Sequence, residues 1–121
     1  MISLLKFDDF IAMLPKGLET EITPEGRNLP KSIQLKILLC RALIGRRQLL
    51  LFEEDFNRLR SNVKNAFIQY LLGQDATVIV ISNDFEVAKQ FDRNIIMQHG
   101  RIISDSNLKE RSTEKWFNEI F

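Results

Sequence analysis

The sequence predicts an α/β fold in which a parallel sheet is flanked by helices. Residues 48–52 and 77–81 are short apolar runs without polar alternation, which is typical of parallel strands buried on both faces. A helix-periodic segment lies between them, and strand–helix–strand alternation implies parallel strands joined by a right-handed crossover. The first run ends in two adjacent acids, Glu53 and Glu54. Ligands bind at the carboxyl ends of such strands, so these acids are candidate site residues.

Composition limits the size and the partners of the protein. At 121 residues the chain forms at most one small domain, and its 45% hydrophobic and 27% charged residues are ordinary for a soluble globular protein. A formal net charge of +1 gives no electrostatic case for binding nucleic acid. No apolar run approaches the roughly 20 residues of a membrane span, and residues 1–5 lack the basic leader of a signal peptide.

Two helices and an irregular segment are expected in the first part of the chain. Apolar residues recur at helical spacing over 4–14, and residues 15–17, Pro-Lys-Gly, stop that helix. Residues 18–29 are irregular, with turn chemistry at 24–26. Pro30 suits the first turn of a second helix, which we expect to end at 45–47. The residues of that helix expected to face the core are Ile33, Ile37, Cys40, Ala42 and Leu43.

Further elements follow the first strand. A helix is expected over Ser61–Leu72, closed by Gly73, and a short helix over 84–90. Strands at 94–98 and 101–105 flank His99 and Gly100, a tight hairpin turn in which glycine is free to adopt a positive φ. The inward residues of the longer helix are Val63, Phe67, Ile68, Leu71 and Leu72, and a terminal amphipathic helix at 113–121 carries Trp116, Phe117, Ile120 and Phe121.

Cys40 is the single cysteine of the chain. It cannot form an internal disulfide, and it stands at an apolar position of a predicted helix. We expect it to pack in the core, in a reducing compartment, rather than to act as a reactive thiol.

Five stretches, at residues 14–22, 28–43, 49–54, 77–82 and 91–102, carry motifs that follow one another in a fixed order along most of the chain. Together they resemble the ATP-binding domain of ABC transporters, over its carboxyl-terminal half. Residues 28–34, Asn-Leu-Pro-Lys-Ser-Ile-Gln, lead into a helix ending Cys-Arg-Ala-Leu, similar to the family's signature loop Asn-Leu-Ser-Gly-Gly-Gln and the helix after it. The acid-ended strand then follows at the family's spacing. Residues 77–82 resemble the family's switch strand, and residues 91–102 resemble the hairpin that comes after it. Residues 14–22 are similar to an exporter-type stretch that precedes the signature.

The resemblance implies a partial P-loop NTPase-type fold, a parallel sheet with flanking helices plus a remnant helical subdomain. It assigns residues 1–45 to the signature-bearing helical portion and residues 46–121 to the carboxyl-terminal half of the ATPase core. The sequence contains no Gly-x-x-x-x-Gly-Lys-Ser/Thr phosphate loop. In the family that loop lies upstream, so we expect it to be missing rather than mutated. ATP and Mg²⁺ are the implied cofactors, and neither is expected to bind tightly to this chain alone.

The resemblance also assigns roles to candidate site residues. Glu53 stands at the family's magnesium-binding aspartate, and Glu54 at the catalytic glutamate that polarises the attacking water. Asn83 replaces the switch histidine; its amide can donate a hydrogen bond but carries no charge. Two alternatives stay open, namely that the acids only begin a solvated turn and that Asn83 caps the following helix.

The signature positions depart from the family's pattern. Pro30, Lys31 and Ser32 stand at the serine and glycines that approach a nucleotide held by the opposite subunit. Proline removes an N–H donor, and the side chains of Lys31 and Ser32 obstruct the close approach that glycine allows. Lys31 could instead supply a point charge. Because Arg60 also replaces an aspartate of the family, we expect a retained fold with weakened or absent hydrolysis.

The implied partners are the upstream half of the ATP-binding domain, transmembrane domains and a second ATP-binding domain. They would place the chain in the cytoplasm, at the membrane through its partners. Without the upstream half, the strands at 48–52 and 77–81 would lack neighbours, so we also expect self-association or a large exposed apolar surface. The alternative is that residues 116–121 fold back as a cover. The transported substrate is not identified, although the stretch at 14–22 favours an exporter.

The predicted function is therefore a degenerate half of an ABC transporter ATP-binding subunit, which couples ATP binding and hydrolysis to transport in a complete protein and is inactive alone. A non-catalytic interaction or regulatory module that keeps the ATPase-core fold is the alternative. A free-standing metal hydrolase built on Glu53 and Glu54 is disfavoured, because the sequence brings no further acid or histidine to them.

Overall fold

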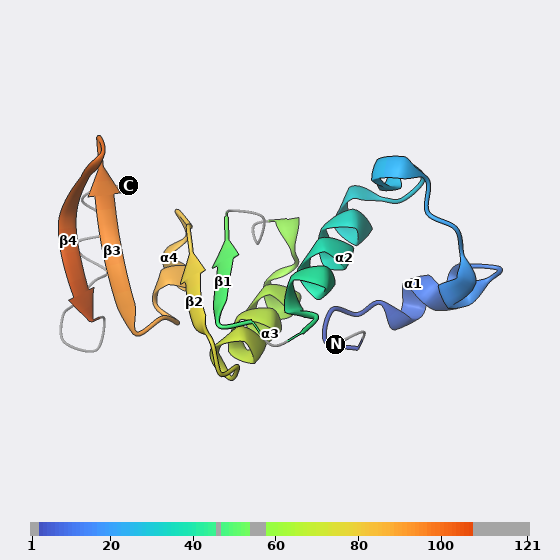
Figure 1. Cartoon of the computed structure of the whole chain (residues 1–121), viewed down its shortest axis with the longest axis horizontal. Helices are drawn as coiled ribbons and strands as arrows, with labels where there is room; N and C mark the ends of the chain where they lie inside the picture. Colours follow the sequence, from blue (N-terminus) through green and yellow to red (C-terminus); the bar gives the residue numbers. More distant parts are fainter. Residues whose placement is uncertain (1–2, 46, 54–57, 108–121) are drawn as a thin grey trace. The chain divides into compact units, whose positions relative to one another are not determined.

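The computed structural model of the protein describes residues 3–45, 47–53 and 58–107. The described residues divide between Ile79 and Val80 into two compact units. This division is different from the predicted boundary between residues 45 and 46, which separates the helical portion from the ATPase core by resemblance to the family. That boundary stays a prediction. In chain order the elements are α1 (Asp8–Met13), η1 (Gly17–Glu19), η2 (Pro24–Gly26), α2 (Lys31–Leu43), β1 (Leu49–Phe52), α3 (Ser61–Leu72), β2 (Thr77–Val80), α4 (Phe85–Ala88), β3 (Arg93–Gln98) and β4 (Arg101–Asn107) (Figure 1).

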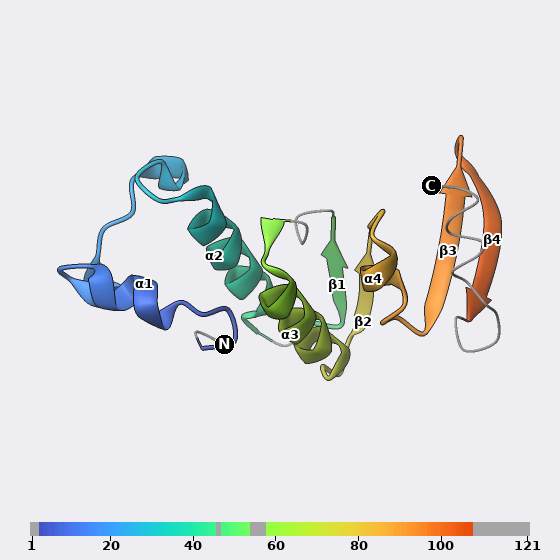
Figure 2. The same cartoon turned by 180° about the vertical axis from the view of Figure 1, so that it is seen from behind.

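The core of the first unit lies between the β1–β2 sheet and its helices. β1 and β2 are neighbours in a two-stranded sheet, and their arrows run in the same direction (Figure 1). Both views show α3 on one face of this sheet (Figures 1 and 2). Phe52 of β1 meets Phe67 of α3 edge to face, with ring centroids 5.9 Å apart. Such a pair is stabilised by the ring quadrupoles as well as by burial.

The prediction that both strands are buried on both faces is wrong for the described residues. β1 alternates between exposed and buried positions, and Leu49 and Leu51 are 52% and 66% exposed. In β2, Ile79 is 48% exposed. The physical reason is that α3 covers one face only, and no described element of the first unit covers the other. The strands are apolar as predicted, but no element of the described first unit packs against their second face.

Two helix predictions also need correction. In α2 the buried residues are Ile33, Leu35 and Leu39. Four of the residues predicted to face the core are only half-buried, namely Ile37, Cys40, Ala42 and Leu43. Apolar residues occur all around this helix, so their spacing alone does not select the buried face. α3 begins and ends as predicted and buries Val63, Phe67, Ile68 and Leu71, but Leu72 is exposed.

The first helix is shorter than predicted because the backbone turns at Lys6. Lys6 has φ +52°, a left-handed conformation that ends any helix running through it. The turn allows Leu5 and Phe7, on either side, to be buried together at 0% and 6% exposure. α1 therefore begins only at Asp8. Burial of two large side chains outweighs the strain of one left-handed residue.

The second unit contains α4 and the antiparallel hairpin β3–β4. His99 and Gly100 form its turn with φ +48° and +75°, so both central residues are left-handed, as a tight hairpin turn requires. The register pairs Gln98 with Arg101 and shifts between Ile96 and Met97. The hairpin prediction is thus confirmed, with each strand slightly longer than expected. The terminal helix predicted at 113–121 lies outside the described residues.

Candidate functional site

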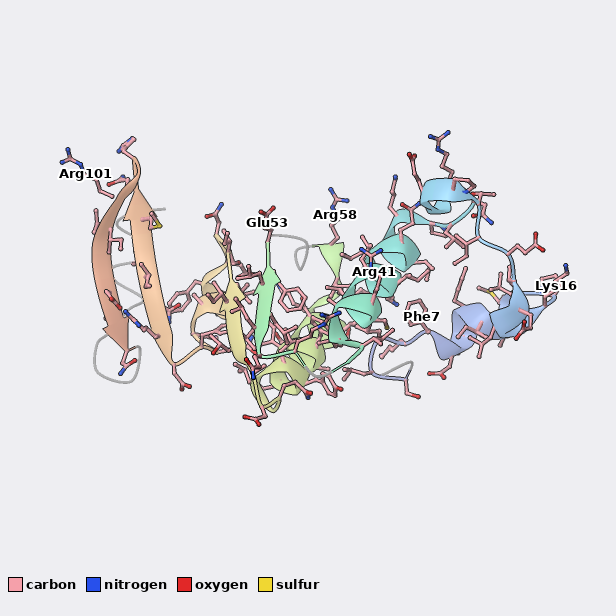
Figure 3. The ribbon with its side chains drawn as sticks, in the orientation of Figure 1. Phe7, Lys16, Arg41, Glu53, Arg58 and Arg101 are labelled. Carbon is pink, nitrogen blue, oxygen red and sulfur yellow. The ribbon has the colours of Figure 1, made fainter. Side chains whose placement is uncertain are left out.

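Glu53 lies directly after β1, at the carboxyl end of the sheet, as predicted. Its side chain is exposed and points away from the strand (Figure 3). Arg58, on the following segment, is also exposed. Glu54 lies outside the described residues, so its catalytic assignment stays a prediction. A single exposed carboxylate is a weak ligand for Mg²⁺, which takes oxygen ligands from several groups.

A metal cluster is not formed by the described part of the chain. Over residues 3–45, 47–53 and 58–107, no three His, Cys, Asp or Glu side chains are placed so that they could hold a metal ion. The assignment of Glu53 to Mg²⁺ therefore stays a prediction, which depends on Glu54 and on groups outside these residues.

Asn83 follows β2 and belongs to the second unit. It is exposed. The alternative that Asn83 caps α4 is wrong, because the cap is Asp84, whose Oδ1 accepts a hydrogen bond from the Glu86 N–H at 2.9 Å. The Asp84 N–H in turn donates to Ser82 Oγ at 3.0 Å. Asp84 therefore occupies the N-cap position, and the predicted role of Asn83 at the switch position stays a prediction.

Pro30, Lys31 and Ser32 are all exposed at the start of α2. Pro30 is the N-cap, and its carbonyl accepts from the N–H groups of Ile33 and Gln34 at 2.9 and 3.0 Å. No side chain caps the helix, and its first turn contains no acid. The first-turn N–H groups and the helix dipole can therefore favour an anion here. A nucleotide role for these residues stays a prediction.

Gln34, which was not among the predicted site residues, links α2 to the loop that precedes it. Its Nε2 donates to two backbone carbonyls, those of Gly26 and Leu29, at 2.9 and 2.8 Å. The signal that could have found it is a glutamine in the first helical turn, beside a loop rich in turn residues, because amide side chains often bond nearby backbone.

The surroundings of Lys36 and Cys40, two further side chains of the first unit, shift their pKa values. Lys36 Nζ donates to the Lys6 carbonyl at 3.5 Å and lies 5.7 Å from the centre of the Phe7 ring. Burial lowers the pKa of Lys36, and the nearby charges of Arg60 and Lys6 lower it further. Burial raises the pKa of the half-buried Cys40 thiol. A raised pKa reduces the reactive thiolate, which disfavours a reactive role for Cys40.

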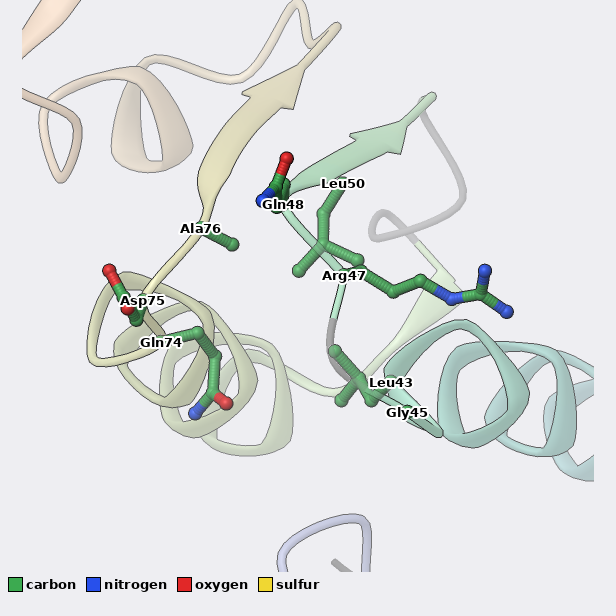
Figure 4. Close-up of a pocket in the computed structure, with 8 residues that line it drawn as sticks. All are labelled: Leu43, Gly45, Arg47, Gln48, Leu50, Gln74, Asp75 and Ala76. Atoms are coloured by element: carbon green, nitrogen blue, oxygen red, sulfur yellow. The ribbon is translucent and has the colours of Figure 1, made fainter.

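A pocket of about 480 Å³ lies at the other end of the sheet (Figure 4). Apart from Leu50 of β1, its lining residues precede β1 and β2, so the pocket is at the amino ends of these strands and not beside Glu53. Polar side chains at its rim, including those of Gln48 and Asp75, are exposed. The lining residues are Leu43, Gly45, Arg47, Gln48, Leu50, Gln74, Asp75 and Ala76.

The chain is similar to transport proteins of bacteria and mammals. It is 30% identical over 104 residues to the alpha-hemolysin translocation ATP-binding protein HlyB of Proteus vulgaris, covering 84% of this chain and 15% of that protein. It is 26% identical over 101 residues to the pediocin PA-1 transport/processing ATP-binding protein PedD of Pediococcus acidilactici, covering 83% and 14%. It is 24% identical over 103 residues to antigen peptide transporter 2 of Mus musculus, covering 85% and 15%. Its homologues are the ATP-binding proteins of ABC exporters.

The structure agrees with this relationship to ABC exporters at the level of the fold. A bacterial Atm1-family ABC exporter solved with ATP bound matches 99% of this chain and 22% of the exporter chain, with a TM-score of 0.78 and 20% identity. No family model matches the sequence. The chain spans about 15% of the length of the curated relatives it matches. In the described residues, no helix is both long and apolar enough to cross a membrane.

Proposed function

We propose that this chain forms the carboxyl-terminal half of an ABC exporter ATP-binding domain, and that a complete protein uses it to couple ATP binding and hydrolysis to transport. The observation that carries the proposal is the extent of the similarity. Sequence relatives align over more than four-fifths of the chain, and an exporter matches nearly all of its fold. By contrast, an isolated motif match would carry little weight.

In this proposal the site is completed by other parts of the protein. The upstream half would supply a phosphate loop, because the 121 residues contain none. Glu53 would contribute to Mg²⁺ binding, Glu54 would polarise the attacking water, and Asn83 would lie beside the terminal phosphate. The first turn of α2, with Lys31 and Ser32, would face a nucleotide bound by a second ATP-binding domain. Transmembrane domains would hold the assembly at the cytoplasmic side of a membrane.

The chain alone is proposed to be inactive. Phosphoryl transfer depends on positioning and charge stabilisation of the phosphates, and the groups that do this in P-loop enzymes are the loop amides and its lysine. Pro30 and Asn83 replace a hydroxyl and an imidazole of the family's site, so weak hydrolysis is expected even in a complete protein. These two departures favour the second candidate, a non-catalytic module that keeps the ATPase-core fold.

The test compares the chain with the polypeptide encoded together with its upstream sequence. The 121-residue chain is expected to show no Mg²⁺-dependent ATP hydrolysis above background, and Glu54→Gln should leave that background unchanged. Glu19→Gln, at an exposed position of η1, is the matched control. The longer polypeptide is expected to bind ATP.

Two results would contradict the proposal in different ways. Magnesium-dependent hydrolysis by the chain alone that disappears in Glu54→Gln would show a free-standing hydrolase. A longer polypeptide that lacks a phosphate loop and binds no ATP would instead favour the non-catalytic module.

A further inference from the structure

The loop that leads into α2 is closed by a turn at residues 26–29. The Leu29 N–H donates to the Gly26 carbonyl at 2.9 Å, so the two residues bracket the turn. The side chain of Gln34, in the first turn of α2, donates from Nε2 to the carbonyls of the same two residues, Gly26 at 2.9 Å and Leu29 at 2.8 Å. One carboxamide therefore joins both ends of the turn to the helix that follows it.

The chemistry of this contact requires a donor at position 34. Both partners are carbonyl oxygens, so only the NH₂ group of the carboxamide can satisfy them, and both of its protons are used. The contact is part-buried, where a lost donor is not simply replaced by water. Gly26 has φ +63°, and a Cβ at this position would lie 3.4 Å from Gln34 Cγ. Glycine therefore suits the left-handed backbone conformation at this position, and the Gln34 side chain packs directly beside it.

The Asn28 side chain forms hydrogen bonds to residues 21 and 23, at the start of the same loop. Its Oδ1 accepts from the Thr23 N–H at 3.1 Å and from Thr23 Oγ1 at 2.9 Å. Its Nδ2 donates to the Glu21 carbonyl at 3.3 Å. The loop at 21–29 is thus closed on itself by Asn28 and attached to α2 by Gln34. The position of this loop and the orientation of the first turn of α2 therefore depend on each other.

We propose that Gln34 is a positioning residue that holds the turn at 26–29 against α2 and so fixes the direction of the first-turn amides of Lys31 and Ser32. The attachment itself depends only on the contacts described here. Its functional consequence rests on the proposed function, in which those amides face a nucleotide phosphate. Gln34 itself does not contact the nucleotide in this proposal. It acts through the backbone of the turn and of Pro30.

The first experiment measures amide hydrogen exchange in the 121-residue chain. Gln34→Glu keeps the shape of the side chain but places carboxylate oxygens against two carbonyls. Exchange of the Leu29, Ile33 and Gln34 amides is expected to rise about tenfold, because two part-buried hydrogen bonds are lost. Gln34→Arg keeps several donors and is expected to restore exchange to within about threefold of the original.

The matched control is Gln74→Glu, which makes the same change at an exposed glutamine that donates to the Tyr70 carbonyl at 3.1 Å. It is expected to leave exchange at 29–34 unchanged. Unaltered exchange in Gln34→Glu would overturn the proposal. So would a rise spread equally over α2 and α3, because that would reflect lost global stability rather than a released loop.

The second experiment uses the complete transporter polypeptide and measures ATP affinity and turnover. Gln34→Glu is expected to raise the KM for ATP about tenfold with a smaller change in kcat, while the melting temperature stays within a few degrees and Gln34→Arg restores KM. If the loop is released in the first experiment but KM is unchanged, Gln34 has no positioning role and that part of the proposal fails. If the unsubstituted complete polypeptide binds no ATP, the proposed function fails, and the exchange result alone decides the attachment.

Discussion

The two strand pairs of this chain are held together in different ways. β3 and β4 are joined by a two-residue turn whose residues are both left-handed, and a bidentate ion pair between Arg93 and Asp105 links them at 2.7 and 2.8 Å. β1 and β2 are separated along the chain by α3, and β1 joins the core through the buried side chains of Leu50 and Phe52 on one face of the sheet. Local sequence is sufficient to define the hairpin. The parallel pair depends on packing, and half of that packing is absent from the described residues.

The largest effect is expected from removing the packing under the parallel pair. Phe67 is fully buried and meets Phe52 edge to face, so Phe67→Ala should lower the free energy of unfolding by about 3–5 kcal/mol. Urea denaturation followed by circular dichroism measures this change. Leu51→Ala, on the exposed face of the same sheet, is the control and should cost less than about 1 kcal/mol. Equal losses in the two variants would mean that the exposed face is covered after all.

The next effect concerns self-association through the exposed face of β1 and β2. Replacing Leu51 and Ile79 together by lysine should weaken association more than about tenfold, because a charge in an apolar interface must be desolvated. Light scattering after size-exclusion chromatography, over a dilution series, measures it. A control with lysine at Gln98 and Asn107 adds equal charge at exposed hairpin positions. An unsubstituted chain that is a monodisperse monomer and binds no hydrophobic dye would contradict this expectation.

A smaller effect is expected at the hairpin turn. Gly100 has φ +75°, where an L-residue with a Cβ is strained, so Gly100→Ala should cost about 1 kcal/mol. Amide exchange across β3 and β4 reports the loss. Gly73→Ala is the matched control, because Gly73 has an ordinary φ of −83° and space for a Cβ. Similar losses in the two variants would show that the backbone conformation of the turn is not what stabilises the hairpin.

The smallest effect is expected at the exposed ion pair of the hairpin. The hydrogen bond from Arg93, followed by its charge, lowers the pKa of the Asp105 carboxyl. A lowered pKa stabilises the hairpin above the unfolded value of about 3.9, and this stabilisation is lost as the pH falls through the lower folded value. Titration of the carboxyl by NMR checks the direction. Asp105→Asn should remove the pH dependence with little change at neutral pH, because exposed pairs contribute little. A pKa at or above the ordinary value would contradict the pairing.

Sequence reasoning located most elements because their signals are local. α3 has one apolar face and a glycine after its last turn, and its predicted bounds coincide with the structure. The hairpin turn was predicted from Gly100. The buried face of α2 was not predicted correctly. Leucines and isoleucines occur on all sides of this helix, so the elements that pack against it determine which of them are buried. The left-handed turn at Lys6 was missed for the same reason, because only the burial of its neighbours explains it.

For the candidate site, too, some positions could be predicted from local sequence and others depend on the folded backbone. The place of Glu53 after β1 follows from the end of an apolar run, and the structure agrees. Asp84 rather than Asn83 caps α4, since two adjacent residues can both cap a helix and the backbone selects one. The glutamine in the first turn of α2 is a signal for a bond to nearby backbone, but its two acceptors could not be named from the sequence, because they come together only once the turn at 26–29 has formed.

The shift of register between Ile96 and Met97 has a consequence for solubility. A bulge leaves one residue unpaired, bends its strand and increases the local twist. A bent and twisted edge is a poor template for another strand, so β3–β4 is protected against the edge-to-edge addition that begins amyloid-like aggregation. β1 and β2, by contrast, expose leucine and isoleucine side chains. When the protein is overproduced, precipitation should therefore begin at the parallel strands and leave the hairpin intact.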